Sequence, residues 1–213
     1  MLVDLYYGQY ADFKTVSKKE AAKLLSADSM IGDCMTIDCE MTGDEHRAWL
    51  INPLGECVGY LDAAMSRQMS LEKAKGMQLC AVLSFLAFTD SPDDGYYWGE
   101  VALICYSPAY EDCFSAFVHN VADRMGRGQR TPVDLGPDAI TRIIASDGTW
   151  FPEQTLPLPE KAKGTAIIKS RRTLNDKLIS QGRAGNKGCY IVSWIFLLVL
   201  VAAIIFGLKS CFF

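Results

Sequence analysis

The stretch RAWLINPLGECVGYLD, residues 47–62, decides how the N-terminal part of this chain is expected to fold. It holds two runs rich in β-forming residues, 47–52 and 56–61, on either side of Pro53-Leu54-Gly55. Because proline presets φ for a turn and glycine tolerates a positive φ, the sequence predicts a β-hairpin here. Asp62 follows the second run and is a good N-cap, so a helix is predicted to begin directly after the hairpin.

The segments on both sides of this hairpin predict further strands and helices. A strand is expected at 34–41, and two long β-rich runs at 77–89 and 96–107 predict a second, more buried hairpin. Shorter elements are predicted as a strand within residues 2–10, a helix opened by the Ser17/Glu20 capping box, and a helix within 136–148. One apolar face at helical spacing predicts an amphipathic helix packed on the sheet: Phe114, Phe117, Val118, Val121 and Met125. The expected fold class is therefore α+β, with an antiparallel sheet and segregated helices.

The charge of the 213-residue chain divides it into two parts of opposite sign. Up to Glu160 there are 12 Lys and Arg against 24 Asp and Glu, a net charge of −12, and from Lys161 onward the net charge is +8. An acidic body repels phosphate backbones, whereas a basic segment attracts anionic surfaces. The predicted organisation is a domain at 1–148, a Pro-containing and then basic linker at 149–189, a membrane span at 190–208 and a short tail at 209–213.

The predicted span rests on 19 residues without a charge, Tyr190 to Leu208. As a helix they would measure about 28 Å, close to the thickness of the hydrocarbon core of a bilayer. Tyr190 and Trp194 lie near one end, where aromatic rings prefer the membrane interface. The residues before the span are basic and no secretory signal precedes the body, which predicts a C-terminal anchor with the body in the cytoplasm. The expected contacts with anionic headgroups are Lys169, Arg171, Arg172, Lys177, Arg183 and Lys187.

No motif in the sequence points to a specific reaction, a metal or a cofactor. The two histidines, His46 and His119, have no neighbours at metal-ligand spacing, and no phosphate-binding glycine pattern or nucleophile elbow occurs. A thiol-dependent enzyme that uses Cys34 or Cys113 is one alternative. The candidate binding residues are instead aromatic and lie at the mouth of the second hairpin: Tyr96, Tyr97 and Trp98.

Residues 31–106 resemble the HIRAN domain, a small barrel of OB-like character. The matching positions are Gly32, Asp33, Glu40, Ala48, Gly55, Val58, Gly59 and Tyr60, while TGDEH at 42–46 lacks the Asn that the family carries before the Ala strand. The resemblance implies a barrel whose family members grip the ends of nucleic-acid strands.

Two functions from different classes follow. The first is a non-enzymatic, single-pass membrane protein whose acidic cytoplasmic domain binds a protein or peptide, with the lipid bilayer and its anionic headgroups as further partners. The alternative is a HIRAN-like nucleic-acid-binding module tethered to the membrane. The charge of −12 disfavours the alternative, because a body of that charge repels nucleic acid.

Overall fold

The computed structural model of the protein describes residues 5–17, 21, 24–26, 29–90, 95–176, 179, 196 and 198. The chain divides into two compact units, residues 1–172 and 173–213. The first unit contains β1 (Tyr6–Lys14), β2 (Cys34–Thr42), β3 (Glu45–Ile51), β4 (Cys57–Leu61), α2 (Ala63–Ala74), β5 (Gln78–Thr89), β6 (Tyr96–Tyr106), α3 (Glu111–Gly126), α4 (Pro137–Ala145) and β7 (Thr165–Lys169).

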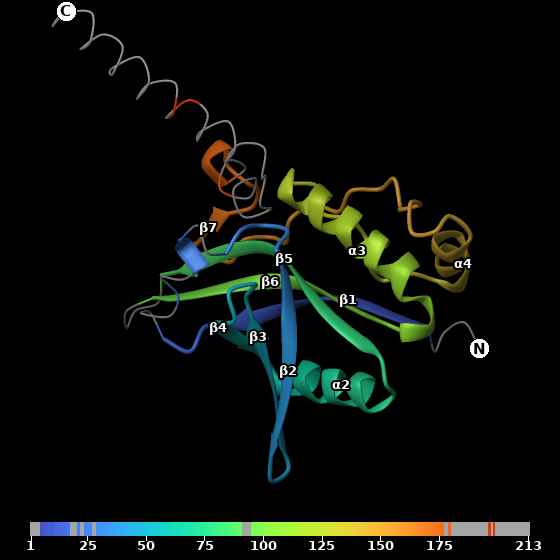
Figure 1. The fold of residues 1–213 in the computed structure, drawn as a ribbon. Coiled ribbons are helices and arrows are strands. Elements are labelled where there is room, and N and C mark those ends of the chain that lie inside the picture. Colours follow the sequence, from blue (N-terminus) through green and yellow to red (C-terminus); the bar gives the residue numbers. More distant parts are fainter. Residues whose placement is uncertain are drawn as a thin grey trace, which may run out of the picture. The chain divides into compact units, whose positions relative to one another are not determined.

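Six of these strands close into an antiparallel barrel (Figure 1). Their order is β2-β3-β4-β1-β6-β5, and β5 pairs with β2 to complete the ring. Each strand turns alternate side chains inward, so the barrel interior is filled by residues such as Phe13, Met35 and Leu50, all at most 1% exposed. The predicted α+β class with antiparallel pairing is confirmed. Of the two expected forms, an antiparallel sheet and a small barrel, the structure shows the barrel.

The hairpin at 47–62 forms as its turn chemistry predicts. β3 and β4 pair with Trp49 opposite Tyr60, and the side-chain oxygen of Asn52 accepts hydrogen bonds from the backbone N–H of Leu54 and of Glu56, at 3.0 and 2.9 Å. The Asp62 carboxylate then accepts from the Met65 N–H at 2.8 Å and caps α2. These local bonds fix both the register of the hairpin and the start of the helix.

Helix α3 covers the outer face of the strands β5 and β6, above them in Figure 1. The five apolar side chains predicted for its inner face are all buried: Phe114, Phe117, Val118, Val121 and Met125. Phe114 packs against Tyr6 of β1 and Tyr106 of β6, with each pair of ring centroids 5.5 Å apart. The predicted amphipathic helix is therefore confirmed, and it ties both hairpin strands and the N-terminal strand into one core.

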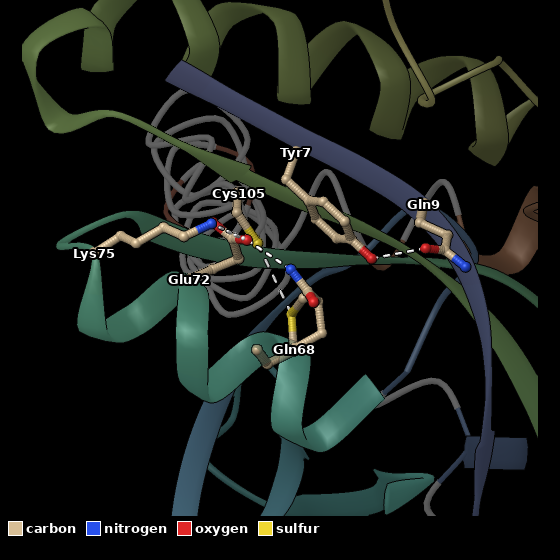
Figure 2. Close-up of polar contacts among 7 residues, drawn as sticks. Tyr7, Gln9, Gln68, Glu72, Lys75 and Cys105 are labelled. Atoms are coloured by element: carbon tan, nitrogen blue, oxygen red, sulfur yellow. Dashed lines mark hydrogen bonds and ion pairs between the residues drawn. The ribbon is translucent and has the colours of Figure 1, made fainter. Parts of the chain in front are cut away.

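Helix α2 lies on the other side of these strands and carries a buried carboxylate (Figure 2). The Glu72 side chain accepts from the amide of Gln68 at 2.7 Å and from the ammonium of Lys75 at 2.8 Å. Next to it the Cys105 thiol donates to the sulfur of Met69 at 3.8 Å. Burial, with the nearby Glu72 as a smaller contribution, raises the pKa of the Cys105 thiol to about 12. This thiol is therefore held protonated and packs as a small apolar group.

The body continues past the boundary expected at residue 148. Residues 165–169, for which the sequence is also compatible with a short helix, form β7 and pair with the second half of β5. The strand forms because β5 leaves the barrel after a bulge near Leu83 and Phe85 and presents an unpaired edge there. The first unit therefore extends to Arg172. Residues 161–172 add five basic residues to the −12 of residues 1–160, so the first unit has a net charge of −7.

The second unit begins with a helix start. The Thr173 N–H donates to the carboxylate of Asp176, and the Asp176 N–H donates to the hydroxyl of Thr173, at 2.8 and 3.2 Å. Within the part of the chain that the structure describes, no helix is both long and apolar enough to cross a membrane. The predicted span at 190–208 lies outside that part except for Phe196 and Leu198.

Candidate binding groove

A groove of about 590 Å³ lies where β1 ends, β3 begins and β4 passes into α2. Its lining is polar and charged, with one aromatic ring. The residues are Lys14, Asp44, Glu45, His46, Arg47, Tyr60, Leu61, Asp62, Ala63, Ala64 and Arg67. A concave site with a few convergent polar groups is the usual form of a ligand-binding site in a small domain.

Strand pairing brings the groove residues together from separate parts of the sequence. Lys14, the last residue of β1, lies opposite Tyr60 of β4. The β2–β3 turn and the start of β3 supply Asp44 and Glu45, and α2 supplies its N-cap Asp62 and Arg67. The groove therefore depends on closure of the barrel, because only closure places the end of β1 beside β4.

On the aromatic side of the groove, the guanidinium of Arg47 contacts two aromatic rings. The guanidinium of Arg47 lies 4.8 Å from the ring centroid of Tyr60 and 5.5 Å from that of Trp49. The two rings meet edge to face at 5.6 Å, and the indole N–H of Trp49 donates to the carboxylate of Glu40 at 2.9 Å. Each cation–π contact at an exposed site contributes about 0.5–1 kcal/mol, so the stack fixes the direction of the guanidinium.

The groove carries both signs of charge. Three cations, Lys14, Arg47 and Arg67, face three carboxylates, from Asp44, Glu45 and Asp62. His46 adds a ring whose Nδ1 is buried and has no hydrogen-bond partner among the described residues. The start of α2 also lies here, and a helix N-terminus favours negative charge. The arrangement can bind an anionic group through the cations, accept hydrogen bonds from hydroxyls through the carboxylates, and stack a flat ring beside Tyr60.

The aromatic residues predicted as a binding site lie elsewhere, on β6. Tyr96 is 49% exposed, whereas Tyr97 packs on Phe88 with ring centroids 4.9 Å apart. Trp98 packs on Phe85 at 5.5 Å and donates its indole N–H to the hydroxyl of Thr89 at 2.9 Å. Since side chains alternate along a strand, Tyr97 points away from its two neighbours. The structure does not bring these three side chains to one surface, and a binding role for them stays a prediction.

The basic residues predicted to contact headgroups fall into three groups. Lys169 and Arg172 have partners in the body: the Lys169 ammonium donates to the carbonyls of Leu24, Ser26 and Ser29, and the Arg172 guanidinium donates to the carbonyl of Ile31. Arg171 is exposed. The remaining predicted contacts and interfacial anchors lie outside the described residues, and they are Lys177, Arg183, Lys187, Tyr190 and Trp194. Membrane contact therefore stays a prediction for all of these residues.

The two thiols considered for catalysis lie in different environments. Cys113 on α3 is 3.9 Å from the carboxylate of Asp147, and His119 lies six residues further along the helix on an exposed position. Cys34 is exposed at the start of β2. Among the described residues, neither thiol has a histidine as a hydrogen-bond partner, and no cluster of three or more metal-ligating side chains occurs.

Comparison with known proteins gives no family for this fold and groove. No family model matches the chain, and no curated protein matches it. Among solved structures, a protein from Lactobacillus plantarum determined by the Northeast Structural Genomics Consortium is 12% identical. That match covers 47% of this chain and 96% of the other, with a TM-score of 0.32.

Proposed function

We propose that this chain is a membrane-anchored binding protein, without catalytic activity of its own, whose barrel domain holds the end of a single-stranded nucleic acid in the groove. The observation that carries the ligand assignment is the composition of the groove: cations, carboxylates and the ring of Tyr60 within one concave site. The resemblance to the HIRAN domain at residues 31–106 supports the same ligand, because all groove residues except Lys14 lie within that range.

The end of a strand suits this mixed groove better than the middle of a strand does. A terminal nucleotide presents one phosphate, a free sugar hydroxyl and an unstacked base. Lys14 and Arg67 can bind the phosphate, the carboxylates of Asp44 and Glu45 can accept from the hydroxyl, and Tyr60 offers a ring to the base. A long backbone track would instead need a continuous basic surface, and the net charge of −7 for residues 1–172 opposes it.

The nucleic-acid proposal is tested with the full-length protein in detergent micelles. We expect a linear single-stranded DNA of ten nucleotides, labelled internally, to raise fluorescence anisotropy at low salt, with binding that weakens as salt rises. A circular single strand of the same composition should bind at least tenfold more weakly. Equal binding of the circle and the linear strand would remove the end-binding proposal, and no binding of either at low salt would remove nucleic acid altogether.

A peptide or protein partner is the second candidate function, and one observation favours it. The groove has as many carboxylates as cations, so a zwitterionic peptide end also complements it. The same anisotropy assay with short labelled peptides of mixed charge separates the two candidates. Peptide binding that unlabelled linear DNA does not displace would favour the second.

The anchor forms part of the same proposal and rests on the sequence of residues 190–208. The 19 uncharged residues and the basic residues before them support a single span with the barrel domain on the cytoplasmic side. Because the body extends to Arg172, the connection to the span shortens from 29 residues, 161–189, to 17 residues, 173–189. The groove would therefore work close to the membrane surface.

A further inference from the structure

Two cysteines meet at the seam where the barrel closes. Cys34 is the first residue of β2 and lies opposite Val82 of β5 in the antiparallel register. Cys80 is two residues before Val82, so it lies on the same face of the sheet and diagonally across from Cys34. An interaction between the thiols of Cys34 and Cys80 shifts the pKa of both.

The two thiols differ in exposure and in charge preference. Cys34 is exposed, whereas Cys80 is partly buried. The hydrogen bond from Cys80 lowers the pKa of the Cys34 thiol, and the guanidinium of Arg172 acts in the same direction, while burial and the Asp33 carboxylate oppose them. The same hydrogen bond, together with burial, raises the pKa of Cys80. The two thiols thus differ in exposure and in the direction of their pKa shifts, in the sense expected of an attacking and a resolving cysteine.

Three other cysteines of the described chain lie in different surroundings. Cys105 faces α2 and contacts the sulfur of Met69. Burial raises the pKa of Cys39. Cys113 lies on α3 beside Asp147. None of these three thiols has a second thiol as its hydrogen-bond partner among the described residues. Cys34 and Cys80 differ from them because their thiols lie next to each other.

The pairing between β2 and β5 is short, so a disulfide across it would matter for keeping the barrel closed. Only Cys34 opposite Val82 and Met35 opposite Ala81 are in register between β2 and β5. Two backbone hydrogen bonds extend it, from the Gly32 N–H to the Leu83 carbonyl at 2.8 Å and from the Leu83 N–H to the Asp33 carbonyl at 3.1 Å. β1 and β6, by contrast, pair along their whole length from Tyr6 to Lys14.

We propose that Cys34 and Cys80 form a peroxide-sensitive thiol pair whose disulfide locks the β2–β5 seam of the barrel. A disulfide needs the two Cβ atoms about 3.8 Å apart, so the diagonal pair must draw together. Cys34 is the first residue of β2 and one of the two residues in register with β5, so this movement alters the pairing of the seam itself.

The chemistry balances with a peroxide as the oxidant. The Cys34 thiolate attacks one oxygen of hydrogen peroxide, the O–O bond breaks, and the sulfenic acid of Cys34 and hydroxide form. The sulfur of Cys80 then attacks the sulfur of the sulfenic acid, the S–O bond breaks, and the Cys80 proton leaves with the oxygen as water. Two thiols are oxidised to one disulfide and one peroxide is reduced to two waters; a low-molecular-weight thiol reverses the step by exchange.

The test uses the full-length protein in detergent micelles, treated with one equivalent of hydrogen peroxide. We expect peptide mapping without reductant to recover the Cys34–Cys80 cross-linked pair with the loss of two hydrogens, and the melting temperature to rise and to return with dithiothreitol. Cys80→Ser should accumulate a sulfenic acid at Cys34 that dimedone traps, and Cys34→Ser should trap none at Cys80. Cys113→Ser is the matched control and should form the cross-link as the unmodified protein does.

A second measurement does not depend on oxidation. Phenylarsine oxide bridges two adjacent thiols, so it should protect Cys34 and Cys80 together from alkylation by N-ethylmaleimide and leave Cys113 reactive. Loss of protection at the one remaining thiol in each serine variant, with circular dichroism unchanged, would support the pair. Free thiols at both positions after peroxide, dimedone adducts on Cys34 and Cys113 alike, or independent alkylation of the two thiols under arsenical would overturn it.

Discussion

Arg130 and Glu100 form a buried, two-pronged ion pair between the segment after α3 and strand β6. The Nε of Arg130 donates to one carboxylate oxygen at 2.9 Å and its Nη2 to the other at 2.7 Å, and the side chains are only 15% and 5% exposed. The guanidinium also lies 3.8 Å from the ring centroid of Tyr10, and its Nη1 donates to the carbonyl of Pro157. One side chain therefore attaches the chain at residues 130 and 157 to the outside of the barrel.

Removal of the arginine should be costly, because it leaves a buried carboxylate without its partner. We expect Arg130→Met to lower the free energy of unfolding by about 3–5 kcal/mol at neutral pH. Chemical denaturation of the full-length protein in micelles measures it. The control is Arg142→Met, since Arg142 contacts the exposed side of Trp150 and should change stability by less than about 1 kcal/mol.

The effect should depend on pH in a defined direction. Burial raises the pKa of Glu100 above its ordinary value although Arg130 opposes the shift. Without Arg130 that pKa rises further. A carboxyl group whose pKa is higher in the folded state than in the unfolded chain destabilises the fold progressively as pH rises through its folded pKa. The loss in Arg130→Met should therefore be largest at neutral pH and shrink as the pH approaches 4.5; a loss that is constant from pH 7 to pH 4.5 would contradict this account.

Gly99 lies at a tightly packed point of the barrel wall. A Cβ there would lie 2.7 Å from the carbonyl oxygen of Phe85 and 2.6 Å from the ring of Phe13. Gly99→Ala should therefore destabilise the protein by about 1–3 kcal/mol, because the backbone of β5 cannot move without breaking its ladder. Gly136→Ala is the matched control, since its Cβ would meet no atom within 4 Å and its φ is −75°. Equal melting temperatures for the two variants would count against this packing.

Lys169 joins the last strand to the segment before β2. Its ammonium donates to the carbonyls of Leu24, Ser26 and Ser29 at 3.1, 2.7 and 3.3 Å. We expect Lys169→Met to cost about 1.5–3 kcal/mol, the usual value for hydrogen bonds to a charged group. Amide hydrogen exchange should become faster around residues 24–31. Lys163→Met, at an exposed position six residues earlier, should leave exchange there unchanged.

The groove makes a prediction of its own for nucleic-acid binding. Arg47→Ala should weaken the binding of linear single-stranded DNA about tenfold and lower the slope of log affinity against log salt by about one. The stack on Tyr60 and Trp49 holds this guanidinium in place. Arg127→Ala is the control, because Arg127 is 66% exposed and pairs with Asp123 on α3. If both variants lose affinity equally, binding is a general charge effect and the groove is not the site.

The membrane anchor is tested by fractionation. The full-length protein should remain in the membrane pellet after an alkaline carbonate wash, while a chain ending at Arg172 should appear in the soluble fraction. External protease added to sealed cells or vesicles should leave the barrel domain intact wherever the cytoplasmic side is enclosed. Release of the full-length protein by carbonate would exclude a spanning segment at 190–208.

Local features of this fold could be predicted from the sequence because each has its cause within a few residues. The turn at Pro53–Gly55, the cap at Asp62 and the apolar face of α3 are all determined by neighbours along the chain. All three are confirmed. The antiparallel hairpins follow from the same short-range chemistry.

Closure of the barrel and the groove could not be predicted in this way. Both depend on pairing between segments far apart in sequence, such as Lys14 with Tyr60 and Cys34 with Val82. No turn chemistry encodes such pairings. Lys14, Arg47 and Arg67 are therefore not part of any sequence motif. The segments around the two arginines predict only a strand and a helix. β7 was missed for another reason, because a five-residue strand in a basic, Pro-flanked stretch resembles a linker until the edge that it covers is known.

The bulge in β5 divides this strand between two partners, β2 before it and β7 after it. A chain cut at residue 160 would keep the barrel and lose β7, so the backbone groups from Leu86 to Thr89 would face solvent beside the Phe88 ring. Exposed strand edges of this kind recruit strands from other molecules. The first unit thus carries its own protection against self-association in residues 165–169, and a chain cut at a boundary chosen from charge alone would lose that strand.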